Sequence, residues 1–220
     1  MTRCPSALHM LRGWPLVTAM AVVGPAWAGR PLAVDDANTN DRGAGHVEAW
    51  VERAGGATSV TLAPAYAPID GLEFAAALSR DTTNQVNARA LVVKWRITDS
   101  RERGCNVGAS ASVERISGGD AKVRAVNGLL TCNDAHAGSV HLNLGLAKAS
   151  GAASVRTWGL AYERGIGAVT PHVEVFGEKG SRPTLQLGAR SEVARGLQLD
   201  GTWGRNDGEN LYSLGLKFQF

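Results

Sequence analysis

Leu211-Tyr-Ser-Leu-Gly-Leu-Lys-Phe-Gln-Phe220 closes the chain and decides the predicted fold. Leu214, Leu216, Phe218 and Phe220 alternate with small or polar residues, and side chains in a strand point alternately to opposite faces. The segment therefore predicts a strand with one apolar and one polar face. A soluble edge strand could alternate in the same way. An exposed aromatic at the chain end is instead typical of the closing strand of an outer-membrane β-barrel.

The other end of the chain predicts export. Residues 1–28 contain Arg3 and Arg12, the apolar run Trp14–Trp27 and the small-x-small site Ala26-Trp27-Ala28, which together form a cleavable signal peptide. The apolar run is about 14 residues, shorter than the roughly 20 that span a bilayer as a helix. We therefore favour cleavage before Gly29 over a membrane anchor. These features predict the outer membrane of a Gram-negative bacterium as the location.

Composition limits the remaining possibilities. The chain of 220 residues has 23 basic and 20 acidic side chains, and the signal peptide removes two of the bases and no acid. The mature chain is thus almost neutral, which argues against a nucleic-acid partner. We expect three parts: the signal peptide 1–28, an N-terminal periplasmic segment 29–44, and a single barrel domain 45–220. No nucleotide-binding or metal-binding motif is present, so no cofactor is expected.

The mature chain divides into alternating segments of about ten residues separated by turn residues. An even number of such segments indicates a transmembrane antiparallel up-and-down β-barrel of about 12 strands. The segments are 46–53, 58–66, 72–80, 88–98, 105–117, 121–132, 139–149, 154–164, 170–178, 183–192, 197–204 and 211–220.

The two faces of these segments separate a membrane barrel from a soluble β-sandwich. One face is aliphatic, as in Val140, Leu142, Leu144 and Leu146, whereas the other consists mainly of small, polar and charged residues. A soluble sandwich would need a dense inward-facing apolar core, which the second face does not supply. Aromatic residues near the strand ends predict two girdles at the membrane surfaces. They are Tyr66, Phe74, Trp95, Tyr162, Phe218 and Phe220 at one end and Trp203 and Tyr212 at the other.

The polar face carries a set of charged residues that should point into the lumen. One interpretation is a network that fills a narrow barrel and fixes its register. The other is a charged conduction path, in which seven acids against four bases would favour cations. The predicted lumenal network comprises Glu48, Glu52, Glu73, Lys94, Arg96, Glu114, Glu163, Glu174, Arg190, Asp200 and Lys217.

Two cysteines remain after removal of the signal peptide. The Gly118-Gly119 hairpin predicts a register in which paired positions sum to 237, so Cys105 lies opposite Cys132. An oxidising compartment then favours a Cys105–Cys132 disulfide over two free thiols.

The N-terminal segment 29–44 has no strand pattern but contains Asp35 and Asp36. Lys94 and Arg96 should face the lumen near the periplasmic rim, where two nearby carboxylates would lower the cost of burying them. We therefore expect the segment to form a plug at the periplasmic mouth. A flexible periplasmic tether is the alternative.

Several motifs carry a family resemblance. Arg30-Pro-Leu-x-x-Asp-Asp-Ala37, His46-Val-Glu-Ala-Trp-Val-Glu52 and Thr170-Pro-His-Val-Glu174 resemble outer-membrane proteins named for a phenol meta-pathway or, more generally, for transport. Asn143-Leu-Gly145 and the C-terminal strand are also similar. The resemblance spans the mature chain and implies a barrel, export, and uptake of aromatic compounds.

These observations predict a passive channel or transporter for small solutes, hydrophobic or aromatic ones included. The alternative is a structural or plugged barrel without transport, which planar-bilayer conductance would distinguish. A membrane-embedded lipid-modifying enzyme is less well supported, because no serine accompanies His141 and Asn143 in a recognisable motif. We expect outer-membrane lipid and the barrel-assembly machinery as partners, with Phe220 as the assembly signal; deleting Phe220 should lower the amount of heat-modifiable barrel.

Overall fold

The computed structural model describes residues 30–99, 102–117 and 121–220, and every helix or strand element in these ranges is a strand. The predicted signal peptide and the Gly118-Gly119 turn lie outside the described residues. The strands are β1 (Gly45–Ala54), β2 (Ala57–Ile69), β3 (Leu72–Asp81), β4 (Val86–Arg96), β5 (Gly104–Ile116), β6 (Lys122–Asp134), β7 (Gly138–Ala149), β8 (Val155–Glu163), β9 (Val169–Glu178), β10 (Thr184–Ala194), β11 (Leu197–Asn206) and β12 (Glu209–Gln219). No described helix is long and apolar enough to cross a membrane.

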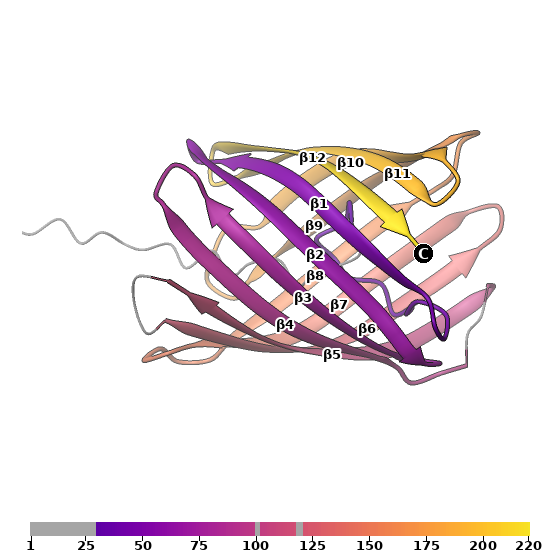
Figure 1. Ribbon diagram of the computed structural model, residues 1–220, viewed down its shortest axis with the longest axis horizontal. Coiled ribbons are helices and arrows are strands. Elements are labelled where there is room, and N and C mark those ends of the chain that lie inside the picture. The colour runs from indigo at the N-terminus through magenta and orange to yellow at the C-terminus, as the bar shows by residue number, and fades with distance from the viewer. Residues whose placement is uncertain (1–29, 100–101, 118–120) are drawn as a thin grey trace, which may run out of the picture.

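The twelve strands form one closed antiparallel barrel (Figure 1). Each strand pairs with its neighbours in sequence, and β1 pairs with β12 to close the sheet, with Val47 opposite Phe218 and Val51 opposite Leu214. Closure leaves no edge strand with unpaired backbone groups. The predicted fold class is confirmed, and the expected strand ends differ from the observed ones by only a few residues.

Burial is inverted relative to a soluble protein. Large apolar side chains face outward and are exposed, among them Leu91 at 64% and Leu214 at 73%, while Glu174 at 1% and Asn106 at 0% are buried inside. An exposed aliphatic belt of this kind is stable when lipid surrounds it. The predicted girdle residues Trp95 and Tyr212 also face outward, at 57% and 50% exposure.

The two ends of the barrel differ in how the strands connect. Gly45 and Phe220 exchange backbone hydrogen bonds of 2.9 Å at what we call the terminal end. At the opposite, hairpin end, β1 and β2 are joined by Gly55-Gly56, and β11 and β12 by Asp207-Gly208. All four of these residues have positive φ, the conformation of tight hairpin turns. The hairpin end therefore carries no large loop among the described connections.

Candidate functional site: the lumen and its N-terminal segment

Residues 30–44 lie inside the barrel rather than beside it (Figure 1). We call them the lumenal segment. Leu32, Val34, Asp35 and Ala37 are buried, with exposures of 7%, 1%, 1% and 0%. The segment has no strand of its own, so its backbone amides depend on the barrel wall for hydrogen-bond partners.

Arg30 begins the segment and connects strands on both sides of the β1–β12 junction. Its guanidinium pairs with Asp200 on β11 and donates to the Ser213 hydroxyl on β12 at 2.9 Å. Its backbone amide donates to Glu48 on β1 at 3.0 Å, and its guanidinium lies over the Trp50 ring at 5.1 Å. Arg30 therefore bridges the closing strands from within.

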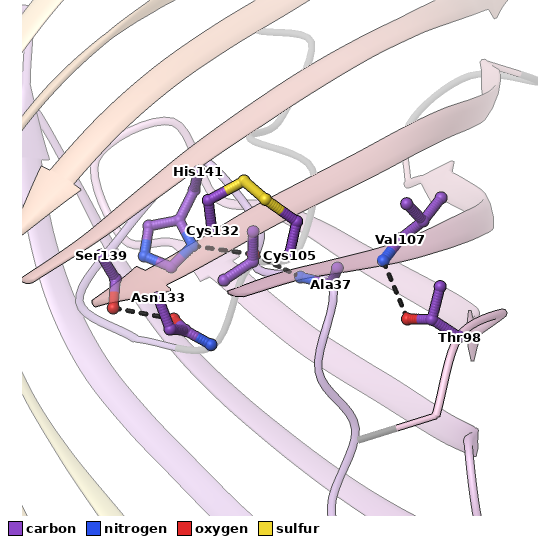
Figure 2. Close-up of a disulfide and its surroundings, with 9 residues drawn as sticks. Ala37, Thr98, Cys105, Val107, Cys132, Asn133, Ser139 and His141 are labelled. Carbon is purple, nitrogen blue, oxygen red and sulfur yellow. Dashed lines mark hydrogen bonds between the residues drawn. A yellow bond between two sulfur atoms is a disulfide. The ribbon is translucent and has the colours of Figure 1, made fainter. Parts of the chain in front are cut away.

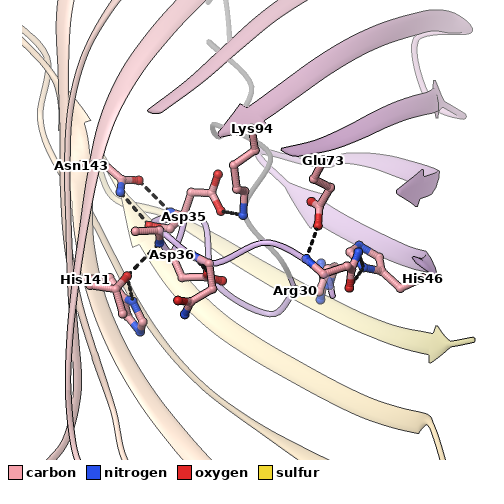
Figure 3. Close-up of polar contacts among 12 residues, drawn as sticks. Arg30, Asp35, Asp36, His46, Glu73, Lys94, His141 and Asn143 are labelled. Carbon is pink, nitrogen blue, oxygen red and sulfur yellow. Dashed lines mark hydrogen bonds and ion pairs between the residues drawn. The ribbon is translucent and has the colours of Figure 1, made fainter. Parts of the chain in front are cut away.

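Asp35 is the centre of the second anchor (Figure 3). Its carboxylate accepts a hydrogen bond from Lys94 Nζ at 2.7 Å, and the two side chains are 1% and 7% exposed. Its backbone amide and carbonyl both bond to the Asn143 side-chain amide at 2.7 Å. The Asn143 side-chain amide thus pairs with both backbone groups of Asp35, as a neighbouring strand would.

Glu174 on β9 forms a third anchor. Its carboxylate accepts hydrogen bonds from the backbone amides of Ala33 and Val34, both at 2.8 Å, and from the Gln186 side chain at 2.9 Å. Val34 packs with Leu32 in a small apolar cluster against the wall. The acid satisfies two amides that would otherwise be buried without partners.

The rest of the segment is anchored near the terminal end. The Ala37 amide donates to Thr131 Oγ1 at 2.8 Å, and the Asn40 amide donates to Glu73 at 2.8 Å. The Asn106 side-chain amide donates to Asn38 at 2.9 Å. Together with the other anchors, these contacts connect the segment to β1, β3, β4, β5, β6, β7, β9, β11 and β12.

Lumen-facing glycines make room for the segment. A Cβ on Gly159 would lie 2.7 Å from Val34 Cγ2, and one on Gly215 would lie 2.7 Å from Arg30 Nε. Real Cβ atoms do not approach other heavy atoms this closely, so larger residues at these positions would push the segment away. The wall is shaped to accept the segment.

The second predicted plug residue, Asp36, has a different partner from the one expected. Its carboxylate accepts the Asn38 amide at 2.6 Å, whereas Arg96 donates to Thr39 at 3.3 Å. Burial would raise the pKa of the Asp36 carboxyl, but Lys94, His141 and the Asn38 amide together hold that pKa below its ordinary value. Of the two expected acid–base pairings, only Asp35 with Lys94 is a direct ion pair.

The structure places the other residues of the predicted lumenal network on the inner face. Lys217 lies 3.3 Å from Glu48, and Arg190 lies 2.6 Å from Glu163, which is also 3.5 Å from His141 Nε2. These pairs lie in the half of the barrel nearer the terminal end. Glu52 and Glu114 lie in the other half.

A cavity of about 330 Å³ remains between the lumenal segment and the wall. Asp36, Asn38 and Asn40 line it from the segment, and small residues of β2 and β3, such as Ala63 and Ala77, line it from the wall. The lumen is therefore narrowed but not filled.

The lumenal wall near the hairpin end is acidic. Glu52 lies in register with the buried, lumen-facing Ser213, and Glu114 with the buried Ala90. Asp81, Glu178 and Glu209 occupy equivalent inward positions on β3, β9 and β12. No basic side chain of the described strands faces inward in this half. We call these five acids the acidic vestibule.

Sequence reasoning missed three vestibule residues, Asp81, Glu178 and Glu209, and two of them lie next to a basic residue at a strand end. Arg80-Asp81 and Glu178-Lys179 appear as neutral pairs when charge is counted along the chain. Alternation sends the two side chains of each pair to opposite faces, which is the signal that could have revealed the vestibule.

The Cys105–Cys132 disulfide is present, with an S–S distance of 2.07 Å (Figure 2). The observed register pairs Val107 with Leu130 and Ala111 with Val126, as the hairpin prediction required. Both cysteines belong to the outward face, so the bond lies outside the lumen and joins β5 to β6 near the terminal end.

The described residues contain no group of three or more His, Cys, Asp or Glu side chains that could hold a metal ion. His141 accepts or donates a hydrogen bond with Thr131 at 2.9 Å and so supports the lumenal segment. No serine is bonded to it in the described residues. The histidine that sequence analysis weighed for catalysis thus has a structural partner.

A closed twelve-strand barrel with an exposed aliphatic belt and a polar lumen defines a transmembrane protein of porin-like fold. The chain belongs to the family described as "Uncharacterised conserved protein UCP029691", which matches residues 16–214. The phenol meta-pathway name suggested by the resemblance is not the name of this family. No curated protein matches the chain.

Solved porin structures share the fold at low sequence identity. The KdgM porin in complex with disordered oligogalacturonate has a TM-score of 0.71 and 12% identity, covering 80% of this chain and 99% of that chain. The NanC porin has a TM-score of 0.62 and 12% identity, covering 79% and 98%. The Acinetobacter baumannii outer membrane protein Omp33 has a TM-score of 0.59 and 10% identity, covering 80% and 97%.

Proposed function

We propose that this protein is an outer-membrane channel for small hydrophilic solutes that favours cations and is held closed by its lumenal segment. The acidic vestibule carries this proposal, because it gives one mouth of the lumen a single sign of charge. Support for the location comes from the export signal in the sequence, the aliphatic belt, and the porin-like fold.

The vestibule favours cations through its geometry as well as its charge. Glu52 and Glu114 project from β1 and β5, and the other three acids from β3, β9 and β12, so negative charge surrounds the mouth. Acidic rings in a low-dielectric wall concentrate counter-ions and select for cations. The lumenal bases Lys94, Arg190 and Lys217 lie farther in, each beside an acid.

The lumenal segment is suited to a closed state that can open. Its anchors are hydrogen bonds and ion pairs, and its residues Leu32 and Val34 form a small apolar cluster with Ala161. Water and solute ions can replace polar anchors when the segment moves, whereas a large apolar plug would have to expose its core. The 330 Å³ cavity already offers space beside it.

The solute class follows from this chain's own wall. One structural neighbour is described in complex with oligogalacturonate, an anionic sugar, but the acidic vestibule here favours the opposite charge. Of the aromatic compounds implied by the family resemblance, the acidic vestibule admits cationic or neutral, water-soluble forms. Trp50 is one aromatic side chain of the lumen, and the Arg30 guanidinium lies 5.1 Å from the centre of its ring.

Planar-bilayer recording tests the proposal. Full-length mature protein should give rare openings, and a variant lacking residues 30–42 should give frequent, larger steps with reversal potentials that indicate cation preference. Glu52→Gln with Glu114→Gln in the deletion background is the selectivity control, and it should weaken that preference without abolishing conductance.

A structural, plugged barrel is the second candidate, and the many anchors of the lumenal segment favour it. Under that alternative the deletion variant would remain silent although it still shows heat-modifiable migration. Anion-selective conductance steps would instead contradict the proposed cation preference but support the channel function.

A further inference from the structure

The outer surface of the hairpin end carries a band of basic side chains. Six of them come from five consecutive strands, β4 to β8, and we call them the basic collar. They are Arg89, Arg115, Lys122, Arg124, Lys148 and Arg156. Five are exposed and Lys122 is half-buried. All six share the outward face with the lipid-facing residues of their own strands.

Neighbouring collar residues lie directly opposite one another across the sheet. The register pairs Arg89 with Arg115, Arg115 with Lys122, and Arg124 with Lys148. Side chains directly opposite have Cβ atoms about 5 Å apart, and like charges in such pairs destabilise the sheet. Three successive repulsive pairs therefore indicate a surface that becomes favourable when an anion binds to it.

The described part of the chain does not supply that anion. None of the collar residues forms an ion pair there, and no acidic side chain of the described strands faces outward at this end. The acids of the same strand ends face the lumen instead. Glu114 and Arg115 illustrate the separation, since adjacent residues point to opposite faces.

The position of the basic collar relative to the aliphatic belt indicates that its partner is a lipid headgroup. Arg89, Arg124 and Arg156 each lie two residues beyond an exposed apolar residue of the same face, which is Leu91, Val126 or Trp158 respectively. Two residues along a strand span about 6.6 Å. The charges thus begin immediately above the aliphatic belt, where lipid headgroups lie, and do not extend into a separate domain or loop.

The terminal end lacks this arrangement. Its outward and connecting residues mix signs, with Asp99, Glu102 and Asp134 beside Arg103 and Arg164. Net positive charge on the outer surface is thus a property of the hairpin end alone among the described strands. A general need for solubility would not produce this asymmetry.

We propose that the basic collar binds the phosphate groups of phosphorylated lipid headgroups in the leaflet that surrounds the hairpin end. Arginine presents a planar fork that bonds two phosphate oxygens at once, which suits a partner with fixed phosphates. The inference rests on the proposed outer-membrane location with both chain termini on the periplasmic side. This orientation puts the hairpin end in the outer leaflet and makes that partner the lipid A part of lipopolysaccharide. It does not require an open lumen.

Lipid binding by the purified mature barrel in zwitterionic detergent tests this assignment. The probe is fluorescent diphosphoryl lipid A, compared with the same lipid after removal of its phosphates. The test variant is Arg115→Gln, Arg124→Gln, Lys148→Gln, and the matched control is Arg103→Gln, Arg164→Gln, Arg195→Gln at the terminal end. Heat-modifiable migration verifies that each variant is folded.

The wild type and the control should bind the diphosphoryl probe tightly, with an affinity that falls as salt rises. The test variant should bind about a hundredfold more weakly, because each surface cation contributes roughly a factor of five to binding anionic lipid. Equal binding of the dephosphorylated lipid, equal affinity in the test variant, or equal competition by soluble heparin would overturn the assignment. If the barrel gives no conductance but still binds the probe, the lipid-binding proposal stands and only the proposed channel function is rejected.

Discussion

Reversing the charge of Asp35 should release the lumenal segment while leaving the barrel folded. Asp35 and Lys94 are 2.7 Å apart, and both side chains are almost completely buried. Removing one partner of such a pair costs about 3–5 kcal/mol, because the other charge is left buried without compensation. Since 1.4 kcal/mol is a tenfold change in an equilibrium constant, the equilibrium constant for docking of the lumenal segment should fall at least about a hundredfold.

Single-channel recording of Asp35→Lys measures this release directly. Its open probability should rise by one to two orders of magnitude over wild type, within the limit set by full opening. Asp41→Lys is the matched control, since Asp41 belongs to the same segment but is exposed. Both variants should keep heat-modifiable migration, because the segment contributes no strand to the barrel.

The compensating exchange tests whether the pair itself is responsible. Lys94→Glu alone should also open the channel, and Asp35→Lys with Lys94→Glu should restore part of the closed state. A coupling energy of about 1–3 kcal/mol between the two sites is expected for contacting residues. The reasoning is refuted if Asp35→Lys and Asp41→Lys have the same open probability, or if the exchange restores nothing.

Three further outcomes follow from contacts described above. Replacing Cys105 and Cys132 with serine should lower the free energy of unfolding by about 2–4 kcal/mol, measured as a shift in the denaturant midpoint, and unreduced wild type should contain no free thiol. Changing Glu52 and Glu114 to glutamine should move the reversal potential toward zero in a salt gradient; no movement would exclude the vestibule from selectivity. Gly159→Ala should raise open probability because its methyl group meets the lumenal segment, and wild-type gating would show that the segment tolerates the contact.

The strands were predictable because alternate residues of a membrane-barrel strand face the lipid and the lumen, so apolar and polar residues alternate along the sequence. The C-terminal strand shows this most clearly, with Leu214, Leu216 and Phe218 outward and Ser213 inward at 4% exposure. The β5–β6 register was also predictable, because a tight hairpin fixes every pair beyond it. Local pattern and turn geometry were sufficient for both.

The contacts of the lumenal segment were only partly predictable. Charge alone indicated Asp35 and Lys94, but nothing local distinguishes Asp35 from Asp36, whose carboxylate bonds back to its own chain. Asn143, Thr131 and Glu174 bind backbone amides, and amides are the same in every residue. Such contacts depend on the path of an irregular segment through the lumen, which no periodicity encodes.

Arg30 has a consequence for the order of events during assembly. The β1–β12 junction joins the first strand to the last, so it forms only when the whole chain is present. Arg30 binds Glu48 on one side of that junction and Asp200 and Ser213 on the other. Its complete set of bonds therefore exists only around a finished junction. Arg30 is near the start of the mature chain, but it can form all of these bonds only after β12 has paired with β1. Barrel closure and docking of the lumenal segment are then one cooperative step. In an incompletely closed barrel, Arg30 lacks part of its bonds and the lumenal segment is not fully anchored.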